Sequence, residues 1–86
     1  MCTTIALTSP VSGAGKGAAG WFPVTEVTVA YDHPARAEAE HALLIDFSNY
    51  GLGTGSRVAV ELDLASGREL LARLAEAIEA AEKTGL

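Results

Sequence analysis

The chain has 86 residues, enough for one hydrophobic core, and we expect residues 1–86 to form a single domain. Eleven acidic residues against six Lys and Arg give a formal charge of −5, with the cations scattered along the chain. Nucleic-acid binding requires clustered positive charge, so we expect no nucleic-acid partner. No apolar run approaches the ~18 residues of a membrane span, and no basic segment opens the chain. We therefore expect no membrane partner and a cytoplasmic location.

A chain this small needs help to stay folded, because it hides only about 60–65% of its unfolded surface. Cys2 is the only cysteine, so no disulfide can form within the chain. Apolar residues make up 49% of the sequence, and the mean hydropathy is +0.24. Part of this apolar surface is expected to meet a second subunit, which predicts a homo-oligomer, most simply a dimer.

Four segments carry the sequence pattern of β-strands. Residues 3–8 are rich in β-forming side chains, and apolar and polar residues alternate over 26–31, 42–48 and 57–64. Such one-sided alternation is typical of an antiparallel sheet with one apolar face. The glycine-rich segments 10–23 and 49–55 are predicted to be loops, and the longer one is the first place to expect a site.

A helix is predicted over residues 67–83, where apolar residues recur at spacings of three and four. Ser66 and Glu69 have the spacing of a capping box, and Gly85 follows the expected end. The predicted fold is therefore α+β: a four-stranded antiparallel sheet (ββββα) with one C-terminal amphipathic helix packed on one face.

Two histidines form the most suggestive pattern. If Tyr31 pairs with Leu43 across a hairpin, the same register places His33 opposite His41. Two imidazoles at that separation can share a divalent transition metal, with Asp32 as a third ligand and Glu40 or Cys2 as alternatives. The competing interpretation is that both rings only form local hydrogen bonds.

The cysteine offers a different chemistry. The opening Met1-Cys2-Thr3-Thr4-Ile5 resembles the start of choloylglycine hydrolase-type enzymes. That resemblance implies an N-terminal nucleophile, with Cys2 exposed once Met1 is removed. It covers five residues, and the chain is far shorter than those enzymes. The alternative is a buried or edge cysteine.

The long glycine-rich segment contains further candidates. Its Gly15-Lys16-Gly17 lacks the spacing and the hydroxyl residue of a Walker phosphate-binding loop, so it is interpreted as a lid or interface loop. Trp21 and Phe22 can plug the core, line a pocket or anchor a subunit contact, with the core as the default. Lys16, Trp21 and Tyr31 are the residues expected to contact a small-molecule ligand.

Nearly the whole chain resembles a group of small uncharacterised actinobacterial proteins. The matching motifs are Cys2-Thr3, Gly15-Lys16-Gly17, Gly20-Trp21-Phe22-Pro23, Tyr31-Asp32-His33, Glu40-His41-Ala42-Leu43-Leu44 and Glu61-Leu62-Asp63-Leu64-Ala65-Ser66-Gly67. The resemblance implies a domain of unknown function and supplies no catalytic residue.

Three functions follow as hypotheses. The first is a homo-oligomeric binding domain with a polar site for a metal or small ligand near His33 and His41. The second is a small enzyme that uses these histidines or Cys2 as base or nucleophile. The third is an accessory protein that binds another protein through a sheet edge.

Overall fold

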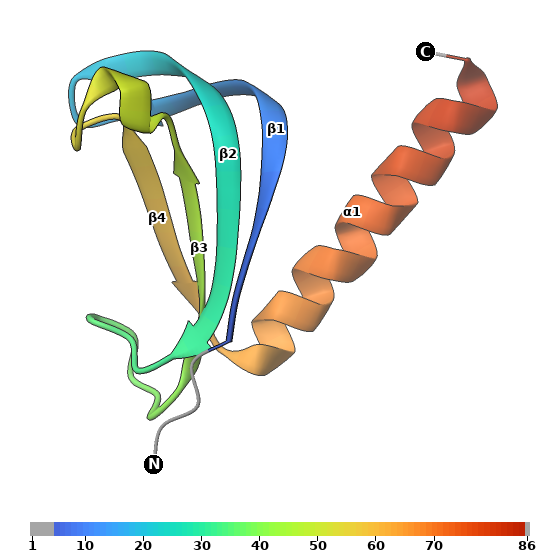
Figure 1. Cartoon of the computed structure of the whole chain (residues 1–86). Helices are drawn as coiled ribbons and strands as arrows, with labels where there is room; N and C mark the ends of the chain where they lie inside the picture. Colours follow the sequence, from blue (N-terminus) through green and yellow to red (C-terminus); the bar gives the residue numbers. More distant parts are fainter. Residues whose placement is uncertain (1–4, 86) are drawn as a thin grey trace.

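The computed structural model describes residues 5–85, which form four strands and one long helix. The elements are β1 (Ile5–Gly17), β2 (Gly20–Asp32), β3 (Ala42–Ser48), a short 3₁₀ helix η1 (Tyr50–Leu52), β4 (Arg57–Leu62) and α1 (Leu64–Thr84). The strands lie in the order β1-β2-β3-β4, and each pairs antiparallel with its neighbour (Figure 1). This confirms the predicted α+β class with four antiparallel strands followed by one C-terminal helix.

The strand register gives the sheet one apolar face and one polar face. Residues paired across antiparallel strands point to the same side, so each row of partners belongs to one face. One side of the sheet is built from three rows of residues, and we refer to it as the apolar face. The rows are Ile5, Tyr31, Leu43 and Leu62; Leu7, Val29, Ile45 and Val60; and Ser9, Val27, Phe47 and Val58. The polar face carries the intervening residues, among them Thr28, Asp46 and Glu61.

The segment 10–23 is not a loop, and that prediction was wrong. It continues β1 and β2 into one long hairpin, in which Gly13 pairs with Val24 and Gly17 with Gly20 across a two-residue turn. Glycine weakens a strand but does not prevent pairing, and Pro10 is tolerated because β1 is an edge strand next to a register shift.

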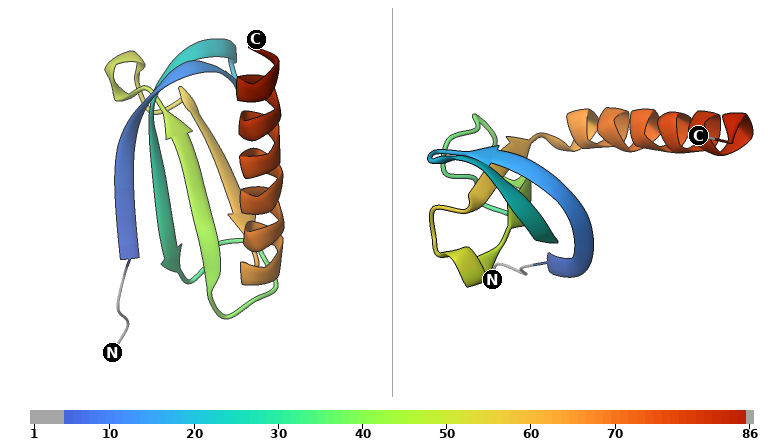
Figure 2. Two further views of the ribbon diagram at one scale, coloured as in Figure 1. Left: turned by 90° about the vertical axis from the view of Figure 1, so that its right-hand side faces the viewer. Right: turned by 90° about the horizontal axis from the view of Figure 1, so that it is seen from above.

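The far end of this hairpin bends back over the sheet, as Figures 1 and 2 show, and reaches β4. A Cβ added at Gly17 would lie 3.2 Å from the carbonyl oxygen of Gly55 and from the ring of Phe22, which explains why glycine occupies this position. Phe22 and Val24 are buried here, with exposed fractions of 8% and 6%. Together with Ala42 they are the buried apolar side chains of residues 5–85, so the interior of one chain is small.

Helix α1 begins three residues earlier than predicted. Asp63 is the N-cap, and its carboxylate accepts a hydrogen bond of 2.7 Å from the amide of Ser66. The predicted capping box of Ser66 and Glu69 is therefore wrong, because Ser66 already lies inside the first turn. Gly85 ends the helix with φ 71°, as predicted.

The helix does not pack on the sheet, which corrects the second half of the predicted architecture. Only its first turns contact the sheet, where Gly67 lies against Leu43, and no helix residue is buried. Figures 1 and 2 show α1 running away from the strands. The physical reason is the connection: β4 ends at Leu62 and α1 begins at Leu64, so the chain has one residue in which to turn back.

Candidate functional site

Three aromatic rings come together at the end of the apolar face. The pairs Tyr31–Leu43 and Asp32–Ala42 confirm the predicted register, which places His33 and His41 next to each other beyond the last pair. The His33 and His41 ring centroids are 4.4 Å apart at an interplanar angle of 34°. Tyr31 also stacks on His41, with ring centroids 5.6 Å apart at an interplanar angle of 21°. We call Tyr31, His33 and His41 the ring cluster.

A hydrogen bond fixes the orientation of one imidazole. Nδ1 of His33 lies 2.8 Å from the carbonyl oxygen of Glu40, and a carbonyl oxygen only accepts, so Nδ1 carries the hydrogen. In the neutral ring the lone pair is then on Nε2. A backbone carbonyl on one ring nitrogen is also the arrangement that orients metal-binding histidines in proteins.

Glu61 holds the loop that joins the two histidines. This loop, residues 33–41, turns over the polar face, and its amides converge on the Glu61 carboxylate. Oε2 accepts from Ala35 at 2.7 Å, and Oε1 accepts from Arg36 at 2.8 Å and from Ala37 at 2.9 Å. Since His33 and His41 are the two ends of the loop, Glu61 acts as a positioning residue for the ring cluster.

The same contacts change the acidity of this carboxyl group. Hydrogen bonds to the charged form favour it, so the amide of Ala35, then those of Ala37 and Arg36, lower the pKa of Glu61 below its ordinary value. The carboxylate therefore stays charged to lower pH than a free glutamate, and the loop is held over that extended range.

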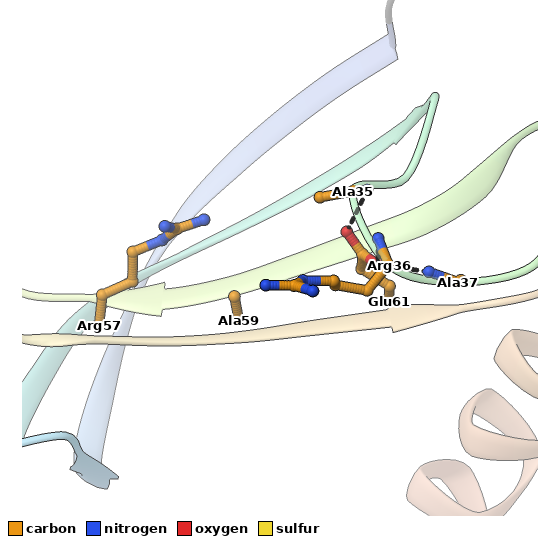
Figure 3. Close-up of a pocket in the computed structure, with 6 residues that line it drawn as sticks. All are labelled: Ala35, Arg36, Ala37, Arg57, Ala59 and Glu61. Carbon is orange, nitrogen blue, oxygen red and sulfur yellow. Dashed lines mark hydrogen bonds between the residues drawn. The ribbon is translucent and has the colours of Figure 1, made fainter.

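Figure 3 shows the concavity that this loop forms with the polar face. It has a volume of about 540 Å³, and its lining consists of Ala35, Arg36, Ala37, Arg57, Ala59 and Glu61. Arg57 forms a two-pronged contact with Asp46, at 2.6 and 3.0 Å. Of the two arginines in this lining, Arg57 thus pairs with Asp46, whereas Arg36 contacts Glu61 through its backbone amide. The role of Glu61 in holding the loop was not predicted from the sequence.

Asp32 does not complete a metal site with the two histidines. Its Oδ1 accepts a hydrogen bond of 2.8 Å from the backbone amide of His33, and its strand position alternates with that of Tyr31. Within residues 5–85 no three His, Cys, Asp or Glu side chains are grouped so that they could hold a metal ion. A metal at the ring cluster would therefore have two ligands from the described part of the chain.

The expected ligand-contacting residues fall into two separate places. Lys16 and Trp21 are cross-strand partners near the bent end of the hairpin, where both line a cavity of about 290 Å³. Tyr31 lies ten residues further along β2 and lines a different, apolar cavity of about 340 Å³. Trp21 is 71% exposed, so its assignment to the core was wrong, whereas its neighbour Phe22 is buried.

The nucleophile hypothesis rests on Cys2, which lies outside the described residues.

We predicted that the chain has no membrane-spanning segment. Within residues 5–85, no helix is both long enough and apolar enough to cross a bilayer.

Comparison with known proteins gives a family but no characterised relative. Residues 1–86 match the model of a protein family described as one of unknown function. No curated protein and no solved structure matches the chain. The resemblance to a domain of unknown function is thereby confirmed.

Proposed function

The chain belongs to this family of unknown function, DUF6295, and we propose that it is a small cytoplasmic binding domain that takes a divalent transition metal at the ring cluster. The proposal is based on the geometry of the ring cluster. His33 and His41 supply the two protein ligands. Water or a small ligand molecule fills the remaining positions.

The main support for this proposal is the short distance between the two imidazole rings. Metal–nitrogen bonds of about 2.0–2.1 Å at a tetrahedral angle require the two ligating nitrogens to be roughly 3.3 Å apart. The ring centroids are 4.4 Å apart at an interplanar angle of 34°, so the rings are near enough to share one ion once the side chains rotate until both lone pairs point to it. The carbonyl of Glu40 on Nδ1 of His33 leaves Nε2 as the coordinating atom of that ring.

Two imidazole ligands with solvent in the other positions favour a metal that binds nitrogen strongly. The order of affinities for divalent metals predicts Cu²⁺ ahead of Ni²⁺ and Zn²⁺ at such a site. The open positions also provide the place where a small anionic or nitrogen-containing ligand can bind next to Tyr31.

Calorimetry on tag-free, chelator-treated protein tests the proposal. We expect saturable heat with Cu²⁺ and Ni²⁺ at one ion per chain, and loss of that heat in His33→Ala and in His41→Ala. Glu82→Ala is the control, because it removes an exposed acidic side chain near the far end of α1 and should bind the metal as the wild type does.

Two results would remove the proposal. One is an absence of heat with Cu²⁺, Ni²⁺ and Zn²⁺. The other is unchanged binding in the double variant that lacks both imidazoles, which would place the metal elsewhere on the chain.

A further inference from the structure

The apolar face of the sheet is only partly covered in a single chain. Eleven of its twelve residues are apolar, with Ser9 as the exception, and none is buried. Leu7 is 66% exposed and Ile5 48%, and a cavity of about 340 Å³ opens beside them. The twelve residues include no charged side chain, so the face suits an apolar occupant.

Helix α1 also has an apolar side that is exposed to solvent in a single chain. Five large apolar residues recur at helical spacing and lie on one side of α1, and we refer to them as the helix stripe: Leu64, Leu70, Leu71, Leu74 and Ile78. All five are at least 40% exposed, and the charged residues of the helix take the other directions, except Glu82, which lies on this side one turn beyond Ile78. An amphipathic helix of this kind obtains its stability mainly by packing its apolar side.

The surface of one chain is too large for a domain of this mass. The chain exposes 6450 Å², whereas a folded monomer of 8.9 kDa is expected to expose roughly 4,800 Å². Its radius of gyration is 14.5 Å, against roughly 12 Å for a compact domain of 86 residues. The excess is about 1,600 Å² per chain, or about 3,200 Å² for two chains, within the range of obligate homodimer interfaces.

The two surfaces also match in length. The helix stripe from Leu64 to Ile78 spans about 21 Å at 1.5 Å per residue. Strand β3, in the middle of the apolar face, has seven residues and spans about 20 Å at 3.3 Å per residue. One copy of α1 therefore has the length needed to cover the apolar face of one sheet.

We infer that a second copy of this chain covers the apolar face, and that the two copies exchange helices. In this two-fold dimer, α1 of each subunit lies on the apolar face of the other, with the helix stripe inward. Reciprocal exchange follows from the one-residue connection between β4 and α1, because a short hinge that prevents a helix from folding back favours exchange between subunits. The inference rests on these surfaces alone and does not require a metal at the ring cluster.

Nuclear magnetic resonance on a mixed-label sample tests the exchange in the unaltered protein. One half of the sample carries labelled methyl groups, and filtering retains only contacts between labelled and unlabelled chains. We expect contacts from Val29 and Ile45 of the sheet to Leu74 and Ile78 of the helix. Intermolecular contacts confined to helix against helix, or an absence of intermolecular contacts, would overturn the inference.

Sedimentation equilibrium gives the second test, with EDTA present so that metal binding plays no part. The wild type is expected at about 17.8 kDa, twice the 8.9 kDa of one chain. Ile78→Asp places a charge on the helix stripe and should raise the dissociation constant at least ~100-fold. Ala80→Asp introduces the same residue on the charged side of the helix, beside Glu76 and Lys83, and should leave the dimer unchanged.

A wild-type chain that sediments at 8.9 kDa would contradict the dimer, whatever calorimetry shows for the histidines. Equal dissociation constants for Ile78→Asp and Ala80→Asp would contradict the role of the helix stripe. If Ile78→Asp loses its fold, the mixed-label contacts of the wild type decide the question.

Discussion

At the scale of residues, the ring cluster depends on a carboxylate that is not part of it. The loop between His33 and His41 is fixed where three of its amides meet the side chain of Glu61. The two imidazoles therefore keep their relative position through a contact on the opposite face of the sheet. This arrangement predicts that the loop, and the distance between the rings, respond to changes at Glu61.

The first prediction concerns pH. Because the folded pKa of Glu61 lies below the ordinary value of about 4.3, the carboxylate stabilises the loop fully above that pH. This contribution should decrease as the pH falls through the lowered folded pKa. Hydrogen exchange and amide chemical shifts of Ala35, Arg36 and Ala37, followed from neutral pH downward, measure the change.

Glu61→Gln should produce the same loosening at neutral pH, because the amide group offers one acceptor oxygen where the carboxylate offers two. Glu38→Gln makes the same charge change on an exposed side chain of the same loop and is the control. Equal exchange rates at Ala35 to Ala37 in the two variants would show that Glu61 does not hold the loop.

The sequence revealed the histidine pair but not its anchor, and the reason is physical. Alternation along β2 and β3 fixes which residues share a face, so the register that pairs Tyr31 with Leu43 also brings His33 to His41. Glu61 contacts a loop 24 to 26 residues away in sequence through backbone amides, which carry no side-chain pattern. Contacts of that kind become visible only in the folded chain.

At the scale of elements, the junction between β4 and α1 determines where the helix lies relative to the sheet. Asp63 is the only residue between them, and it ends the strand while capping the helix. The helix direction is consequently set within one residue. A longer connection would allow α1 to fold back on its own sheet.

The N-cap provides the prediction at this scale. Asp63→Ala removes the acceptor of the Ser66 amide and should lower the melting temperature by several degrees, whereas Asp63→Asn keeps a capping side chain and should remain near the wild type. Circular dichroism during heating measures both. A melting temperature for Asp63→Ala equal to that of Asp63→Asn would contradict the capping role.

The elements were predictable to different degrees. Strands β3 and β4 and the body of α1 follow from strong periodicity, and the end of the helix follows from Gly85. The extension of β1 and β2 through residues 10–23 was missed because glycine and proline in that segment indicate turns. Backbone pairing with a neighbouring strand overrides this local preference.

At the scale of the whole molecule, a single chain lacks a sufficient interior. The buried apolar side chains of residues 5–85 are Phe22, Val24 and Ala42, all outside the three rows of the apolar face. A subunit contact was predicted from the high apolar content, without a location on the chain. The cover of the sheet was then expected from the helix of the same chain.

We infer that a second chain completes the core, and urea unfolding at several protein concentrations tests this inference most directly. If folded dimers unfold to separate chains, the midpoint rises with concentration. A tenfold increase contributes about 1.4 kcal/mol, which at a slope of about 2 kcal/mol per molar urea predicts a rise of about 0.7 M. A midpoint that stays constant over a hundredfold range of protein concentration, with complete unfolding at every concentration, would contradict completion of the core by a second chain.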